Sequence, residues 1–355
     1  FIMAYTTINK STVHFNTKLY SGDGGTQSVT GVGFQPDWTW LKSRSAGYNH
    51  RLFNAVRGAG KNTASNLNDA EQTVDEGVTA FNTDGFSVKQ GGVLETNNSS
   101  HTYVSWNWKA NGQGSANTDG SINTTYTSVN TTAGFSISTY TGTGSNATVG
   151  HGLGAKPDLM IVKNLGATEN WMVYHKELDT SAPEDYYVLL NSNAGRVNEA
   201  TVWNDTAPTS SVFSIGTHAA TNQSGNAHIA YCFTEKTGYS KFGLYTANNN
   251  ADGPFIYLGF KPAFVIFKIL GSSGNFHMYD NKRTTSNTST SPWRLRAETT
   301  AVEAQDTNDK IDFVSNGIKI KSNGVSINNH TGSVIYWAFA EAPLVGSNNI
   351  PATAR

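Results

Sequence analysis

Three stretches of this chain repeat one pattern of residues. In each, a proline stands three positions after a glycine and opens a run of bulky residues that ends at a lysine. The stretches are 33–42, 154–163 and 259–268. Their prolines, Pro36, Pro157 and Pro262, lie roughly 105 to 120 residues apart, which is the size of a small domain and too long for a solenoid unit. The sequence therefore predicts three tandem copies of one module.

Further segments recur in the same order in each copy and support the triplication. They are a middle segment (50–54, 171–175 and 276–280), a short leucine segment (around Leu67, Leu189 and Leu295), a segment of alternating residues (84–88, 212–216 and 316–320) and a closing aromatic segment (104–108, 230–233 and 336–339). We expect modules at 1–132, 133–238 and 239–344, followed by a C-terminal tail at 345–355.

The local patterns predict strands rather than helices. Runs of four to eight residues rich in Val, Ile, Thr and aromatic residues are separated by Gly, Asn, Asp and Ser. Helical spacing is suggested only near 70–78 and 301–306. The run after each repeated proline is apolar at both parities, as expected for a strand covered on both faces, here by loops over the outer sheet. We predict an all-β chain of three tandem antiparallel β-sandwich modules of the jelly-roll type.

Composition narrows the class of protein. Charged residues make up 14% of the chain, against about 25% in typical globular domains. The polar surface is therefore expected to consist of Asn, Thr and Ser, which suits extracellular or virion proteins. A net charge of −1 without a basic run gives no nucleic-acid footprint.

No apolar run has membrane-spanning length, and no signal peptide opens the chain; whether translation begins at Met3 or upstream stays open.

The repeated charged residues have a structural and a functional interpretation. Lys42, Lys163 and Lys268 end equivalent strands, and we expect them to reach solvent along their stems, the alternative being a shared binding groove. Glu235 and Glu341 are in register with each other, and we expect them to end strands and pair with the repeated lysines rather than to catalyse. The paired carboxylates of sugar-cleaving jelly rolls are missing. No catalytic residue is assigned, and we expect a protein that is not an enzyme.

No metal or cofactor is predicted from the histidine spacing. Calcium stays open as a ligand, because scattered Asp and Asn in turns can bind it without a recognisable loop.

Five aromatic residues near turns are the candidates for carbohydrate binding, because sugar rings stack their C–H groups on aromatic faces. They are Trp171, Trp203, Trp293, Tyr186 and Tyr187. Packing inside or between modules is the favoured alternative for all five.

The repeat resembles one found in structural proteins of tailed, often marine, bacteriophages. The matching residues of the first copy are Gly33-Phe34, Pro36-Asp37, Lys42, His50, Leu52-Phe53-Asn54, Arg57-Gly58, Asp69-Ala70-Glu71, Asp84-Gly85-Phe86 and Tyr103 through Ala110. The ending Ala338 to Pro343, followed by 349–355, is also similar. The second copy lacks the Asp-Gly-Phe turn, and Ala263 replaces the aspartate in the third. The resemblance implies a concanavalin- or laminin-G-like jelly roll on a virion surface and carries over no catalytic residue.

We therefore expect a non-enzymatic virion protein, made in the host cytoplasm and displayed on the virion surface. The leading hypothesis is a tail fibre or spike that contacts host-surface glycans, with three modules giving avidity. The alternatives are a purely architectural capsid or tail component and a polysaccharide hydrolase. Partners are expected to be other virion proteins, with no nucleic acid and no membrane insertion. A homo-oligomer is expected, although three modules in one chain can already supply a pseudo-threefold arrangement.

Overall fold

The structure is a computed structural model that describes residues 5–271, 273–287, 292–305, 310–323 and 327–345. The described residues contain 27 strands and four one-turn helices: η1 (Ser11–Val13), η2 (Pro183–Asp185), α1 (Ala200–Trp203) and α2 (Ala219–Asn222). The prediction of an all-β chain of antiparallel sandwich modules is confirmed. The helical spacing near 70–78 was misleading, because strands form there instead.

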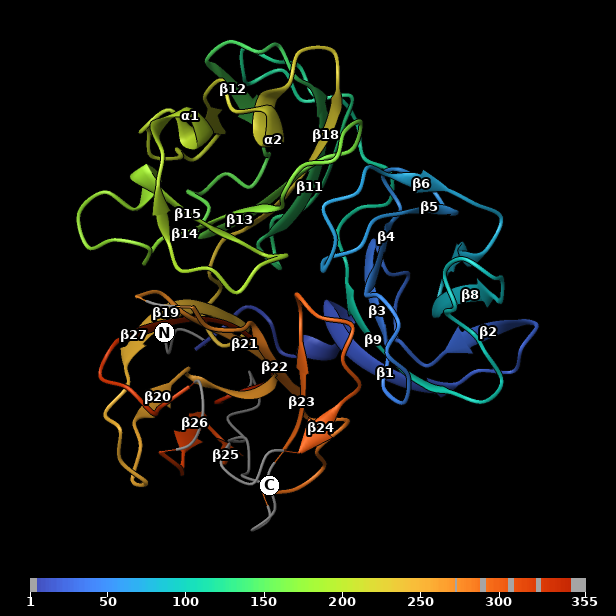
Figure 1. Cartoon of the computed structure of the whole chain (residues 1–355), viewed down its shortest axis with the longest axis vertical. Coiled ribbons are helices and arrows are strands. Elements are labelled where there is room, and N and C mark those ends of the chain that lie inside the picture. The colour runs from blue at the N-terminus through green and yellow to red at the C-terminus, as the bar shows by residue number, and fades with distance from the viewer. Residues whose placement is uncertain (1–4, 272, 288–291, 306–309, 324–326, 346–355) are drawn as a thin grey trace.

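The strands form three groups placed around a common centre (Figure 1). The first module has an inner sheet of order β1-β9-β3-β4 and an outer sheet of order β2-β8-β7. The inner strands are β1 (Phe15–Ser21), β9 (Thr102–Trp108), β3 (Trp38–Ser43) and β4 (Arg51–Asn54). The outer strands are β2 (Thr26–Thr30), β8 (Gly85–Lys89) and β7 (Gly77–Asn82), and a small hairpin adds β5 (Lys61–Asn62) and β6 (Gln72–Thr73).

The second module repeats this plan with a longer inner sheet, of order β10-β11-β18-β13-β14-β15-β16. Its strands are β10 (Tyr126–Asn130), β11 (Phe135–Thr141), β18 (Ala227–Phe233), β13 (Leu159–Asn164), β14 (Met172–His175), β15 (Tyr186–Leu189) and β16 (Val197–Asn198). The outer sheet pairs β12 (Ala147–Gly150) with β17 (Val212–Ile215).

The third module has an inner sheet of order β19-β27-β21-β22-β23-β24 and an outer sheet of order β20-β26-β25. The inner strands are β19 (Ser240–Thr246), β27 (Ser333–Pro343), β21 (Phe260–Ile269), β22 (His277–Asp280), β23 (Trp293–Arg296) and β24 (Ala304–Gln305). The outer strands are β20 (Phe255–Tyr257), β26 (Gly317–Ile320) and β25 (Ile311–Val314).

One expected module boundary needs correction. Strand β10 pairs with β11, with Tyr126 opposite Thr139. The second sheet therefore begins at Tyr126, and the boundary expected between residues 132 and 133 falls inside its first hairpin. Met3 and residues 346–355 of the expected tail lie outside the described residues.

Strand parity explains why the run after each repeated proline is apolar throughout. Successive side chains of a strand point to opposite faces. In β3, Leu41 packs in the core between the two sheets of the first module, whereas Trp38 and Trp40 join a core shared by all three modules. In β13, Met160 and Val162 pack in the second sandwich, whereas Leu159 and Ile161 join the shared core. The second face of each strand is thus covered by neighbouring modules and not by loops.

The shared core is rich in aromatic rings that touch across module boundaries. Trp38 stacks on Tyr231 of the second module, with ring centroids 4.4 Å apart. Phe233 lies 5.6 Å from Phe339 of the third module, and Phe339 lies 5.3 Å from Phe15 of the first. Large aromatic surfaces contribute strongly to buried contacts. The three inner sheets therefore pack on one another as a single core.

Three equivalent backbone hydrogen bonds link the modules in sequence and close the ring. Each accepting carbonyl stands two residues after a repeated lysine. The bonds run from Glu71 N to Leu165 O at 2.9 Å, from Arg196 N to Leu270 O at 3.1 Å, and from Glu303 N to Arg44 O at 2.9 Å. They join the first module to the second, the second to the third, and the third back to the first. The chain is a closed ring with approximate threefold symmetry.

Candidate functional site

The three repeated lysines are buried, so the expectation that they reach solvent is wrong. Each ammonium donates to backbone carbonyls at the end of its own strand or in the loop that follows it. Lys42 Nζ lies 2.7 Å from Ser43 O, and Lys163 Nζ lies 2.7 Å from Asn164 O. Lys268 Nζ lies 2.5 Å from Gly274 O. A lysine ammonium carries three N–H donors and no acceptor atom, so it can bind several backbone carbonyls at once.

Two of these lysines also hold the preceding module. Lys163 donates to Asn68 O of the first module at 3.2 Å, and Lys268 donates to Ala194 O of the second at 2.7 Å. Burial lowers the pKa of Lys42 to about 7 and the pKa values of Lys163 and Lys268 to about 8. Desolvation disfavours the charged form of each lysine. Lys163 and Lys268 thus stabilise the interfaces between modules, and the three lysines do not line a common groove.

The last residue of the middle strand reaches the next module in all three copies. Asn54 Nδ2 donates to the hydroxyl of Tyr231 at 2.9 Å, and Asp280 Oδ2 accepts from Trp106 Nε1 at 3.1 Å. His175 Nε2 donates to Tyr336 O at 3.1 Å, while its Nδ1 accepts from Glu177 N at 3.1 Å. Burial lowers the pKa of His175 to about 3. The imidazole is neutral, and its two partners fix the proton on Nε2.

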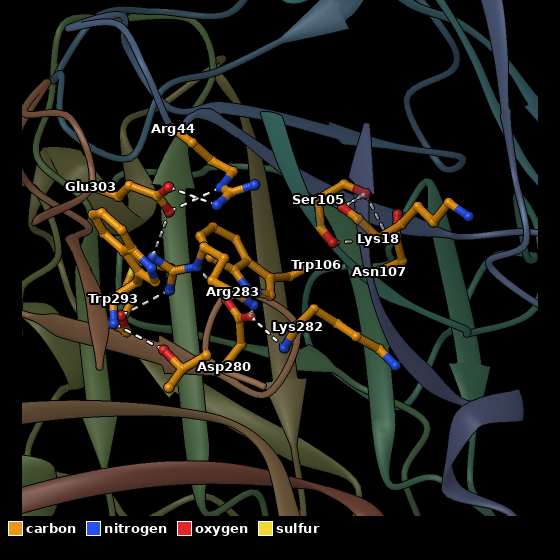
Figure 2. Close-up of polar contacts among 12 residues, drawn as sticks. Lys18, Arg44, Ser105, Trp106, Asn107, Asp280, Lys282, Arg283, Trp293 and Glu303 are labelled. Atoms are coloured by element: carbon orange, nitrogen blue, oxygen red, sulfur yellow. Dashed lines mark hydrogen bonds and ion pairs between the residues drawn. The ribbon is translucent and has the colours of Figure 1, made fainter. Parts of the chain in front are cut away.

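A buried ion-pair network surrounds the contact between the third and first modules (Figure 2). Arg283 Nε lies 2.5 Å from Asp280 Oδ2, and both side chains are fully buried. Glu303 accepts from Arg44 Nε at 2.9 Å and lies 3.9 Å from Arg283 Nη1. The equivalent pair in the first module is Arg57 with Glu71, 2.8 Å apart. Each of these charges has a partner of opposite charge where it is buried, so its desolvation is compensated at the interface.

The two glutamates in register do not pair with the repeated lysines, contrary to expectation. Glu235 pairs with Lys176 at 2.7 Å, and Glu341 pairs with Lys261 at 3.6 Å. Lys261 directly precedes the repeated Pro262, and Lys176 also pairs at 3.3 Å with Asp158, which follows the repeated Pro157.

The aspartate that follows the proline in the first two copies holds the chain after the closing strand. Asp37 accepts from Ala110 N at 2.7 Å, and Asp158 accepts from Glu235 N at 2.6 Å. Ala263 has no such acceptor. There, β21 continues through Pro262 along β27 with register shifts.

Two of the five candidate sugar-stacking residues are buried, in agreement with the favoured alternative of packing inside or between modules. Trp171 donates from Nε1 to Ala64 O of the first module at 2.9 Å. Trp203 donates from Nε1 to Tyr186 O at 3.1 Å, inside the second module. Both indoles are thus packed with their one donor satisfied.

The other three candidates are partly exposed and do not form one site. Tyr186 and Tyr187 lie on β15 of the second module, and the guanidinium of Arg196 stands 4.6 Å from the centre of the Tyr186 ring. Trp293 begins β23 of the third module, where its backbone N–H donates to Thr284 Oγ1 at 2.8 Å.

The most exposed aromatic side chains among the described residues were not among the candidates. Phe255 and Tyr257 on β20 are each 48% exposed. Their signal in the sequence is weak, because a three-residue aromatic run resembles any core strand. It becomes visible only when the three copies are aligned strand by strand.

The residues that the structure describes contain neither a cluster of metal ligands nor a membrane-spanning helix. No group of three or more His, Cys, Asp or Glu side chains there is placed to hold a metal ion. No helix in this part of the chain has the length and apolarity needed to cross a membrane.

Comparison with known proteins identifies one family. Its sequence profile, described as a domain of unknown function, DUF7483, matches residues 10–343. No curated protein and no solved structure matches the chain. The match spans all three modules as one unit, in agreement with their shared core. The chain therefore belongs to the DUF7483 family.

Proposed function

We propose that this chain is a non-enzymatic structural protein exposed on a phage virion, where it contacts glycans of the host surface. The observation that carries the proposal is the use of the repeated polar residues. Lys163, Lys268, the last residues of the middle strands and the buried Arg283 all contact neighbouring modules. The polar residues that recur in the three copies therefore serve the packing of the modules against one another, and not a reaction. The resemblance to phage structural proteins and the low content of charged residues agree with this role.

The glycan part of the proposal rests on surface chemistry. A surface of Asn, Thr and Ser with exposed aromatic residues offers hydrogen bonds and apolar faces, the two features that sugars bind. A purely architectural role is the second candidate. It is favoured by the ring closure, since a rigid block with satisfied internal contacts suits packing against a virion lattice.

Two measurements test these roles. Immunogold labelling of intact virions locates the protein, and binding of the whole purified chain to host cells and to purified host polysaccharide tests glycan contact. We expect surface labelling and saturable binding. If virions are labelled but the folded chain binds neither cells nor polysaccharide, the architectural role is supported over glycan contact. Absence of the protein from virions would contradict both roles. Repeating the binding in EDTA tests for calcium, and light scattering tests the expected homo-oligomer.

A further inference from the structure

A groove of about 370 Å³ lies between the second and third modules. One side is the turn after β14, which carries Lys176 and Glu177. The other side is formed by β19 and the exposed residues of β20. Figure 1 shows the end of the second module lying against β19 and β27. This volume falls in the range of about 300–1,000 Å³ that is typical of small-ligand sites.

Exposed aromatic residues form one wall of the groove. Phe255 and Tyr257 alternate along β20 with the buried Ile256, so both rings point away from the sandwich core. Large exposed apolar residues gathered at one place mark interaction sites more often than scattered ones do.

The fold does not require aromatic residues at these two positions. Tyr257 lies opposite Gly317, and its counterparts are Thr30, opposite Gly85, and Gly150, opposite Val212. The counterparts of Phe255 are Ser28 and Thr148. The buried residue between the two positions stays apolar in every copy, as Val29, Val149 and Ile256. Two copies of the same sandwich thus form with small residues where the third exposes two rings.

The floor of the groove also differs from its counterparts in the other copies. Tyr336 of β27 lies across Gly243 of β19, and a Cβ at that glycine would come within 2.5 Å of the Tyr336 hydroxyl. In the first module the residue equivalent to Tyr336 is Ser105, whose hydroxyl donates to Lys18 O at 3.4 Å (Figure 2). In the second it is Ala230. The aromatic floor is specific to the third copy.

Neighbouring residues hold the Tyr257 ring in place. Lys241 Nζ donates to Tyr257 O at 3.0 Å and lies 5.4 Å from the centre of the ring. The hydroxyl of Tyr5 donates to Gly259 O at 2.8 Å and is also hydrogen-bonded to Tyr257. A ring that is already ordered loses less conformational entropy when a ligand binds.

The charged residues of the groove balance one another. Lys176 and Lys241 face Glu177 and Glu235, and Lys176 Nζ lies 2.7 Å from Glu235 Oε2. Carboxylates accept strongly from hydroxyl groups, and ammonium groups donate to them. Two positive and two negative side chains favour a ligand that is rich in hydroxyls and uncharged.

We propose that this groove binds a neutral glycan, with sugar rings stacked through their C–H faces on Phe255 and Tyr257. The hydroxyls then donate to Glu177 and Glu235 and accept from Lys176 and Lys241. This inference rests on the proposed contact with host glycans and gives it a location. The first two modules carry small residues at the stacking positions, so their described residues offer no equivalent pair of rings.

The test uses the whole chain, a panel of neutral hexose oligosaccharides and of charged oligosaccharides, and purified host polysaccharide. The double variant Phe255→Ser, Tyr257→Thr installs the residues of the first module, which already fold in this sandwich. We expect the affinity of this double variant for the best panel member to be at least tenfold lower than that of the wild type. The affinity of Glu177→Gln for the same oligosaccharide should be severalfold lower. Val93→Ser removes an exposed apolar side chain of the first module and should leave both affinity and Tm unchanged.

The outcomes separate the site from the function. Tight binding by the wild type that survives the double substitution would overturn the groove while leaving glycan contact intact. Binding by no panel member and no host polysaccharide would overturn both. A preference for charged over neutral oligosaccharides, lost in the double variant, would place a ligand in the groove and overturn its assignment as neutral.

Discussion

Asp280 accepts a hydrogen bond from the indole of Trp106 at 3.1 Å, although 174 residues separate them in the chain. This contact joins the last module to the first (Figure 2). Its counterparts, Asn54 with Tyr231 and His175 with Tyr336, join the other two pairs of modules. One position of the repeat therefore performs the same task three times with three different side chains.

Replacing Asp280 should destabilise the chain strongly. In Asp280→Ala, Nε of the buried Arg283 and Nε1 of Trp106 both lose their acceptor. Breaking a buried ion pair on one side costs about 3–5 kcal/mol. Urea denaturation measures the loss. Asp75→Ala, which breaks the exposed pair with Lys89, is the control and should cost less than about 1 kcal/mol. Equal costs for the two variants would show that the Asp280 contact does not hold the ring.

The buried lysines should make stability rise with pH on the alkaline side. Burial lowers the pKa of Lys163 from 10.5 in the unfolded chain to about 8. Between these values the unfolded chain binds more protons, so the free energy of unfolding increases with pH and this contribution is lost as pH falls through about 8. Lys163→Met should flatten the rise between pH 8 and 10 by up to about 1 kcal/mol per pH unit.

Chemical denaturation at pH 7.5, 8.5 and 9.5 measures this slope for the wild type, for Lys163→Met and for the control Lys321→Met. Lys321→Met, which changes an exposed lysine, should keep the wild-type slope. Parallel curves for Lys163→Met and the wild type would mean that the ammonium stays fully charged in its ring of carbonyls.

His175 should act in the opposite pH range. Its folded pKa is about 3 because burial disfavours the imidazolium, whereas the unfolded value is about 6.5. Stability from this residue is complete above pH 6.5 and falls as pH drops toward 3. His175→Asn installs the first module's residue at this position, and it should reduce the loss between pH 6 and 4.

Thermal unfolding of His175→Asn and of the control His101→Asn, at pH 4, 5 and 6, measures this effect. Partly exposed His101 should not change the acid slope. An unchanged slope in His175→Asn would place the acid sensitivity elsewhere, for instance in another buried histidine.

The equivalence of the three modules was predictable from the repeat, because prolines, turns and aromatic runs recur in the same order in each copy. The register confirms that equivalence: Trp38, Leu159 and Phe264 each lie opposite the last residue of the middle strand. The shared core was not predictable. The sequence shows that both faces of a strand are apolar, but it does not show whether a loop or another module covers the second face.

The errors at individual side chains have the same origin. Trp171 lies near a turn, which made it a candidate for sugar binding, but its indole is covered by the first module, as the packing alternative predicted. The lysines end strands, which suggested solvent, yet the following loops and the neighbouring modules enclose two of them on both sides. The groove was missed because it needs a turn of the second module beside a strand of the third. Side chains that are buried only by contact with another module leave no periodic pattern in the sequence of their own module.

Calorimetry of the intact chain tests most directly whether the three modules form one closed unit. A shared aromatic core and interlocked interfaces predict a single transition, with the calorimetric enthalpy equal to the van 't Hoff enthalpy. Asp280→Ala should shift that transition to lower temperature as a whole. Two or three separate transitions in the wild-type chain, with only one of them moved by Asp280→Ala, would contradict the closed ring.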